Sequence, residues 1–117
     1  MAVEIERQLY ARAEVNWPVT MTTAQGHVEG EARNISPGGV YIHCKSPPAE
    51  NEVFRVKITP PDRLPLEASV EVVWIDMQTA SDETTVPNGM GVRFVEISEE
   101  DRQYLLDLVF DLKELDD

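Results

Sequence analysis

The residues best suited to chemistry gather in one short stretch, residues 34–39. Asn and Ser side chains bond to nearby backbone in turns, and glycine adopts backbone conformations that other residues avoid. The same groups could also bind a ligand, because short polar side chains beside glycines let a flat molecule approach closely. Both a plain hairpin turn and a recognition site therefore remain open. The candidate ligand residues are Asn34, Ser36, Gly38 and Gly39.

Two arginines precede this stretch and could add charge to it. Arg7 and Arg12 flank a short segment before the first predicted strand, and Arg12 lies 22 residues before Asn34. The formal net charge of −12 argues against a nucleic-acid polymer or an anionic membrane as the partner. A small anion held by a few arginines remains compatible with the composition, and the first third of the chain is the best place for it.

Nothing in the sequence predicts an enzyme. The two histidines, His27 and His43, are sixteen residues apart, and neighbours on a strand such as His43 and Cys44 point to opposite faces, so no metal-binding spacing is present. Ser36 lacks the motif that surrounds a nucleophilic serine in hydrolases. The single cysteine, Cys44, is best interpreted as a small buried apolar residue. We therefore expect neither catalysis nor a metal site.

The chain of 117 residues has the size of one domain. Its start is acidic and lacks the apolar core of a signal peptide, and no run is long enough for a membrane helix. With a single cysteine there is no internal disulfide, so we expect a cytoplasmic protein without membrane insertion. We divide it into a flexible, arginine-bearing leader, residues 1–12, and one folded domain, residues 13–117.

Short segments of alternating hydrophobicity predict a protein dominated by β-structure. Val15, Trp17, Val19 and Met21 recur at every second position, which is typical of a half-buried strand. The predicted strands cover residues 13–23, 27–34, 40–44, 53–58, 66–77 and 89–97. Residues 78–88 are polar and are expected to form a loop. Strands at this spacing suggest a small antiparallel barrel.

Three side chains in these strands are expected to have structural roles rather than to bind a ligand. Trp17 and Trp74 are expected to pack in the core or at a barrel end, with Trp74 on the same face as Val72. Arg93 alternates with apolar neighbours, so we expect it to face solvent or to pair with an acid.

The end of the chain predicts one helix, over about residues 98–115. Ser98 resembles a capping residue, and the acidic first turn suits the positive end of the helix dipole. Apolar residues then recur with helical spacing, which predicts one stripe packed over a barrel opening while the acidic face stays in water. The members of the stripe are Leu105, Leu108, Val109, Leu112 and Leu115.

Taken together, these motifs resemble the PilZ domain family. The family combines an R-x-x-x-R motif with a later [DN]-x-S-x-x-G motif, and Asn34, Ser36 and Gly39 match the second motif at each defined position. The strand ending Val72-Val73-Trp74 and the stretch over residues 89–94 add to the resemblance, which covers about residues 6–112.

The resemblance implies a six-stranded antiparallel split barrel with one C-terminal α-helix. It also implies a ligand, the bacterial second messenger cyclic di-GMP, which carries two phosphates and two guanines. Arginine forks match phosphate oxygens and can stack on guanine, and the side chains of Asn34 and Ser36 can bond to a guanine edge. Gly39 would leave room for the ring. Binding would order the leader and change the exposed surface, so the expected role is a receptor or adaptor that contacts an unidentified downstream protein.

The arginine motif departs from the family pattern. The usual spacing places the first arginine at residue 8, which is Gln8, and the chain instead carries Arg7 and Arg12. One possibility is that Arg7 reaches the ligand while Gln8 bonds a base edge. The alternative is that affinity is lost, leaving an interaction module that does not bind the nucleotide. The predicted ligand-binding residues are Arg7, Gln8, Arg12, Asn34, Ser36, Gly38 and Gly39.

Overall fold

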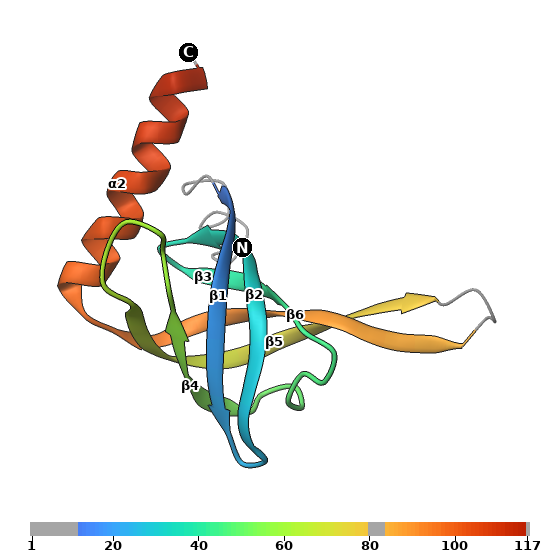
Figure 1. Ribbon diagram of the computed structural model, residues 1–117. Coiled ribbons are helices and arrows are strands. Elements are labelled where there is room, and N and C mark those ends of the chain that lie inside the picture. The colour runs from blue at the N-terminus through green and yellow to red at the C-terminus, as the bar shows by residue number, and fades with distance from the viewer. Residues whose placement is uncertain (1–11, 80–83, 117) are drawn as a thin grey trace.

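A computed structural model describes residues 12–79 and 84–116, with side chains described as far as residue 110. Within these residues, six antiparallel strands close into a barrel in the order β1-β2-β3-β6-β5-β4, and one helix follows (Figure 1). The predicted six-stranded barrel with a C-terminal helix is confirmed. The elements are β1 (Ala13–Thr23), β2 (Gly26–Ser36), β3 (Gly39–His43), β4 (Val53–Ile58), β5 (Leu66–Thr79), β6 (Thr85–Ile97) and α2 (Glu99–Asp116).

The core forms inside the barrel because the strands alternate apolar and polar side chains. Val19 and Met21 of β1 are buried, whereas Thr20 and Thr22 between and after them are exposed. β4 alternates in the same way over its whole length. Each aliphatic side chain that is fully removed from water contributes roughly 1.5–3 kcal/mol, so this alternation fixes which face of each strand points inward.

A β-bulge in β2 breaks the alternation near the end of that strand. Ala32 and Ile35 are both fully buried, with two residues between them instead of one. Ala32 pairs with Ile42 and Asn34 pairs with Tyr41, which leaves Arg33 without a register partner on β3. The extra residue turns Arg33 and Asn34, although consecutive, away from the core.

A second bulge changes the position of Trp74 in β5. The register between β5 and β6 shifts between Val72 and Trp74, and Val73 and Trp74 are both exposed, Trp74 by 40%. The prediction that Trp74 shares a face with Val72 is therefore wrong. Strict alternation fails because the bulge adds one residue to β5, so that Ile75 rather than Trp74 returns to the core.

The hairpin of β5 and β6 is longer than predicted. Gln78 pairs with Val86 and Thr79 with Thr85, so residues 78, 79 and 85–88 belong to strands rather than to a loop. Figure 1 shows this end of the hairpin extending away from the barrel. Because the extension does not border the core, it needs no apolar face, and its polar composition gives no strand signal.

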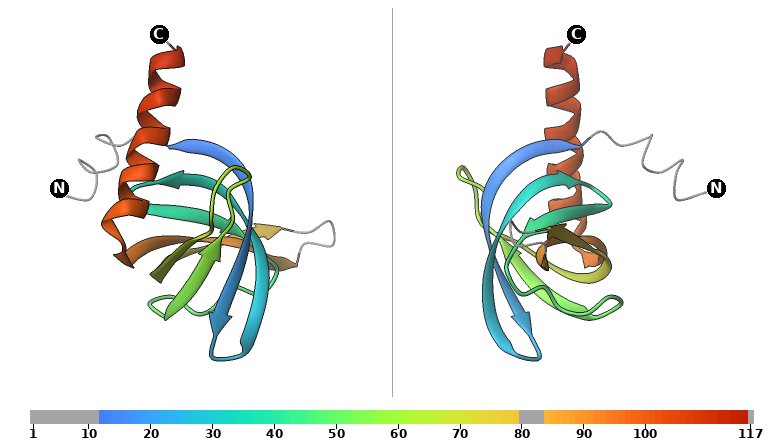
Figure 2. Two further views of the ribbon diagram at one scale, coloured as in Figure 1. Left: turned by 60° about the vertical axis from the view of Figure 1, so that its left-hand side comes forward. Right: turned by 90° about the vertical axis from the view of Figure 1, so that its right-hand side faces the viewer.

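Helix α2 packs against β1 and β2 through its first turns. The backbone N–H of Asp101 donates to the Ser98 hydroxyl at 3.0 Å, as the capping motif predicts. Leu105 and Val109 are buried in the core cluster, whereas Leu108 is only half-buried. The later turns project beyond the barrel in both views of Figure 2. The side chains of Leu112 and Leu115 lie outside the described residues.

Arg63, in the segment between β4 and β5, holds the start of α2 on the barrel. Its guanidinium pairs with Asp101 at 2.8 Å and lies 4.6 Å from the ring centroid of Tyr104. Tyr104 in turn contacts the buried ring of Trp17, with 6.4 Å between ring centroids. Trp17 is therefore buried in the core, as expected, and also packs against the helix. Within the described part of the chain, no helix has the length and apolar character that a membrane span requires.

Candidate ligand-binding site

The turn between β2 and β3 is held by its own hydrogen bonds. The Gly38 backbone N–H donates to the Ser36 hydroxyl oxygen at 3.2 Å, and the Gly38 carbonyl accepts the N–H of Phe94 at 3.0 Å. Ser36 is buried, whereas Gly38 is exposed. The Ser36 oxygen thus has a structural role in the turn, while its hydroxyl hydrogen remains able to donate to another group.

The two glycines of the turn differ in their surroundings. A Cβ added at Gly39 would collide with the carbonyl oxygen of Val92 on β6, so the close approach of β3 and β6 requires glycine there. A Cβ at Gly38 would meet only the Ser36 hydroxyl, at 3.9 Å. Barrel packing therefore accounts for Gly39 without a ligand, and Gly38 is the glycine with open space beside it.

Asn34 lies on the outer face of the barrel, between β1 and β3. Its register partners are Glu14 on β1 and Tyr41 on β3, and its side chain is half-buried. The Asn34 amide makes no hydrogen bond with another residue that the structure describes. Both its donor and its acceptor are thus available to a ligand.

Arg12 comes directly before β1, at the same end of the barrel. The following residue, Ala13, pairs with Ile35, so Arg12 is level with Ser36 and the β2–β3 turn. Arg12 is exposed and makes no ion pair with any residue in the described ranges. The register therefore brings Arg12, Asn34, Ser36 and Gly38 to one end of the barrel, while Arg7 and Gln8 lie outside the described residues.

An aromatic pair that the sequence did not single out adjoins Asn34. Tyr41 and Trp74 stack with ring centroids 5.7 Å apart and planes inclined by 24°. Both are register neighbours of Gly91, where a Cβ would collide with the indole of Trp74. Glycine at 91 therefore lets Trp74 lie against the sheet beside Tyr41. Because the β5 bulge turns Trp74 outward, alternation alone could not find this pair.

Hydrogen bonds from the extended hairpin fix the position of Tyr41. Its hydroxyl donates to Asp76 at 2.7 Å, and the Asn88 side-chain amide donates to Asp76 at 3.1 Å and to the Tyr41 oxygen at 3.2 Å. Burial, followed by the hydrogen bond to Asp76, raises the pKa of Tyr41 to about 12. The hydrogen bonds from Tyr41 and then Asn88 lower the pKa of Asp76. Near neutral pH this cluster therefore holds a neutral phenol and a carboxylate.

Two further arginines of this outer surface are paired with acids. Arg93, the register partner of Gly39, bonds Glu71 at 2.6 Å, as expected for a residue that pairs with an acid. Arg33 bonds Glu31 at 2.6 Å. Arg33 on β2 and Arg93 on β6, the strand next to β3, therefore each have an acidic partner.

Cys44 belongs to the interior rather than to this surface. It is buried in the core cluster, and burial raises the pKa of its thiol. A neutral buried thiol is a poor nucleophile, which agrees with its interpretation as a small apolar residue.

Comparisons with known proteins agree with this architecture. The family model described as "PilZ domain" matches residues 6–111. No curated protein sequence matches the chain. Among solved structures, a PilZ domain of YcgR from Escherichia coli with c-di-GMP has a TM-score of 0.70 and 16% identity, and the match covers 92% of both chains.

Two other similar structures are larger proteins. The Bacillus subtilis inhibitor of motility (MotI/DgrA) has a TM-score of 0.76 and 21% identity, and the match covers 92% of this chain and 51% of that one. The MrkH–c-di-GMP complex of K. pneumonia has a TM-score of 0.73 and 14% identity, with 91% and 52% covered. The chain thus spans about half the length of these two proteins.

Proposed function

The chain belongs to the PilZ domain family, and from that premise we propose that it is a receptor for cyclic di-GMP. Two of the similar structures, those of YcgR and MrkH, were solved with this nucleotide. The ligand offers two negatively charged phosphates and two flat guanines. A site for it needs cationic donors, amide groups for the base edges and a surface for stacking.

The observation that carries the proposal is the convergence of Arg12, Asn34 and the β2–β3 turn at one end of the barrel. The pairing of Ala13 with Ile35 and of Glu14 with Asn34 creates this convergence. The guanidinium of Arg12 and the carboxamide of Asn34 therefore lie at the same end of the barrel, and neither has a partner among the described residues. Among the described residues, the unpaired side chains of Arg12 and Asn34 thus support the proposal that these two motif positions bind the nucleotide.

Each group has a distinct proposed role. The Arg12 guanidinium binds a phosphate or stacks on guanine, because its planar fork suits both. Asn34 and the Ser36 hydroxyl bond to a guanine edge, and Gly38 leaves open space beside the turn. Arg7 and Gln8 complete the site from the leader. The Tyr41–Trp74 stack lies next to Asn34 and offers an aromatic face to a base.

We further propose that the bound protein acts in the cytoplasm by contacting another protein, without catalysis. A nucleotide held by both the leader and the barrel would change the surface around the β2–β3 turn, and a partner could recognise that change. The net charge of −12 argues against a nucleic-acid partner. The competing proposal is a protein-interaction module that has lost the nucleotide, which Gln8 in place of an arginine favours.

Amide chemical shifts of the full chain, recorded during titration with cyclic di-GMP, test the proposal. The largest changes are expected at Arg12, Asn34 and Gly38, with little change at Gly26 in the turn at the other end of β1 and β2. Titration with GTP serves as the ligand control, since it has one guanine and no cyclic phosphodiester. An unchanged spectrum at saturating cyclic di-GMP would favour the competing proposal.

A further inference from the structure

Asn34 owes its outward position to the bulge in β2, and Arg33 directly precedes it. Regular alternation from the buried Ala32 would place Arg33 outward and Asn34 inward. Because Ile35 is the next buried residue, Arg33 and Asn34 both face outward as consecutive residues. The bulge therefore brings Asn34 to the same outer face of β2 as its chain neighbour Arg33.

The positive charge of Arg33 acts on Tyr41 of the neighbouring strand β3. Burial and the hydrogen bond to Asp76 raise the pKa of Tyr41, and the positive charge of Arg33 opposes that rise. Tyr41 is the β3 partner of Asn34. Because Arg33 is the chain neighbour of Asn34, its charge lies on the same outer surface as Asn34 and Tyr41.

The ion pair of Arg33 leaves its guanidinium available to a ligand. The Arg33 and Glu31 side chains are 46% and 39% exposed, with 2.6 Å between their atoms. Exposed ion pairs contribute only about 0–1 kcal/mol, so a phosphate can compete with Glu31 at little cost. A guanidinium also has five donors, and one carboxylate cannot occupy them all.

We propose that Arg33 is a phosphate-binding residue of this site and supplies the second guanidinium that Gln8 does not. The inference rests on the proposed nucleotide-binding function. Arg12 precedes β1 level with Ser36, whereas Arg33 directly precedes Asn34 on β2, so the two arginines approach Asn34 from different strands, which suits a ligand that carries two phosphates. Three acids, Glu14, Glu31 and Asp76, border this surface and oppose phosphate binding, and Arg33 offsets part of that repulsion.

Calorimetric titration of the full chain with cyclic di-GMP tests the role of Arg33. Arg33→Ala is expected to weaken binding roughly tenfold or more, as for loss of a hydrogen bond to a charged group. Arg33→Lys should fall between Arg33→Ala and the wild type, since lysine keeps the charge and loses the fork. Arg33→Ala should also reduce the dependence of affinity on salt, because one phosphate contact is lost.

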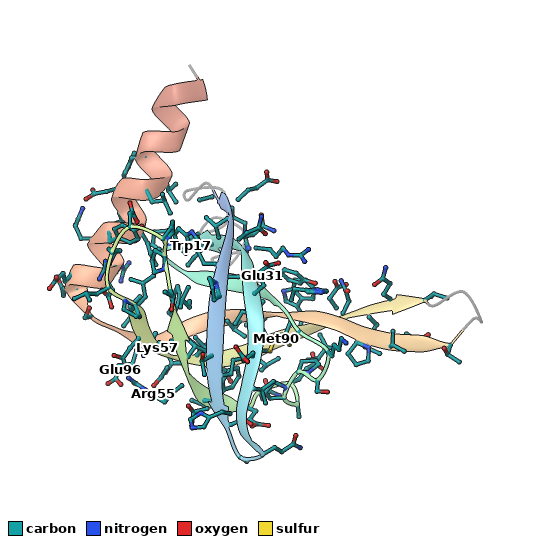
Figure 3. All side chains as sticks on the ribbon, viewed as in Figure 1. Trp17, Glu31, Arg55, Lys57, Met90 and Glu96 are labelled. Atoms are coloured by element: carbon teal, nitrogen blue, oxygen red, sulfur yellow. The ribbon has the colours of Figure 1, made fainter. Side chains whose placement is uncertain are left out.

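Arg55→Ala is the matched control. Arg55 is likewise an exposed strand arginine with an exposed acidic partner, Glu96, at 3.7 Å. It pairs in register with Thr22, eight residues along β1 from Glu14, the register partner of Asn34. Figure 3 shows Arg55 and Glu96 together at the end of the barrel away from Glu31. The affinity of Arg55→Ala for cyclic di-GMP should match that of the wild type within about twofold, the variation expected of a neutral surface change.

A second variant keeps the test decisive if Arg33→Ala folds poorly. Glu31→Ala frees the guanidinium, so it should tighten cyclic di-GMP binding. Equal affinities of Arg33→Ala, Arg55→Ala and the wild type would overturn the role of Arg33 and leave the receptor function intact. Unchanged or weaker cyclic di-GMP binding by Glu31→Ala would have the same consequence. Absence of binding by the wild type would overturn the receptor function, and this inference with it.

Discussion

Asn34 of β2 and Tyr41 of β3 are register partners, and both face the outside of the barrel. The pairing connects the motif that contains Asn34 to an aromatic and polar cluster that no sequence motif predicts. Through Asn34 the site includes the β2–β3 turn, and through Tyr41 it includes Trp74 and Asp76 of the extended hairpin. A nucleotide bound at Asn34 would therefore lie between two parts of the molecule that are distant in sequence.

Gln8→Arg should strengthen cyclic di-GMP binding if the family spacing of the arginines governs affinity. The change places an arginine four residues before Arg12 and adds a charged donor for a phosphate. A charged hydrogen bond contributes roughly 1.5–3 kcal/mol, so the dissociation constant should fall about tenfold or more. Gln8→Ala is the control. Unchanged or weaker binding by Gln8→Arg would mean that another arginine, Arg7 or Arg33, already occupies the phosphate position.

Gly91→Ala should separate Trp74 from Tyr41. The new methyl group would occupy the place of the Trp74 indole, and an exposed side chain can move away without unfolding the barrel. Near-ultraviolet circular dichroism should lose the signal of the stacked pair, with a stability loss of about 0.5–1.5 kcal/mol. Gly38→Ala is the control because its methyl group has open space. A Gly91→Ala spectrum identical to the wild type would contradict the stacked arrangement.

Tyr41 should ionise only at strongly alkaline pH. Its pKa is raised from 10.0 to about 12, because burial and Asp76 disfavour the phenolate. A raised pKa in the folded state stabilises the fold fully below the ordinary value of 10.0 and loses that effect as pH rises through about 12. Ultraviolet absorbance should show one late-ionising tyrosine that is missing in Tyr41→Phe. Identical titration curves for the two proteins would refute this environment.

Leu105 anchors α2 more strongly than Leu108. Leu105 is fully buried and Leu108 only half-buried, so Leu105→Ala should lower the free energy of unfolding by roughly 2–5 kcal/mol and Leu108→Ala by less. Denaturant titration measures both. Asp107→Lys on the exposed face serves as a control that should change stability by at most about 0.5 kcal/mol. The reverse order for the two leucines would mean that α2 packs on a different face.

The barrel could be predicted because its strands alternate apolar residues, which are buried inside it, with polar residues. Val19 and Met21 alternate with polar residues since each strand has one inner and one outer face. The capping of α2 could be predicted as well, because Ser98 and Asp101 are separated by a single helical turn. Both features depend only on contacts between residues close in sequence or on a simple period.

The aromatic half of the candidate site could not be predicted in the same way. Trp74 faces outward because of a bulge, and a single added residue leaves no recognisable pattern in one sequence. Tyr41, Asp76 and Asn88 come from three strands and meet only in the folded barrel. The hairpin extension also escaped prediction, because a ribbon without a buried face does not select apolar residues.

The most direct test of the receptor function is the affinity of the full chain for cyclic di-GMP, measured by calorimetry. The wild type should bind, and Arg12→Ala and Asn34→Ala should each bind more weakly, Arg12→Ala by about ten- to a hundredfold. Lys57→Ala, an exposed change on β4, should bind as the wild type does. No binding by the wild type, or equal binding by all four proteins, would contradict the proposed site.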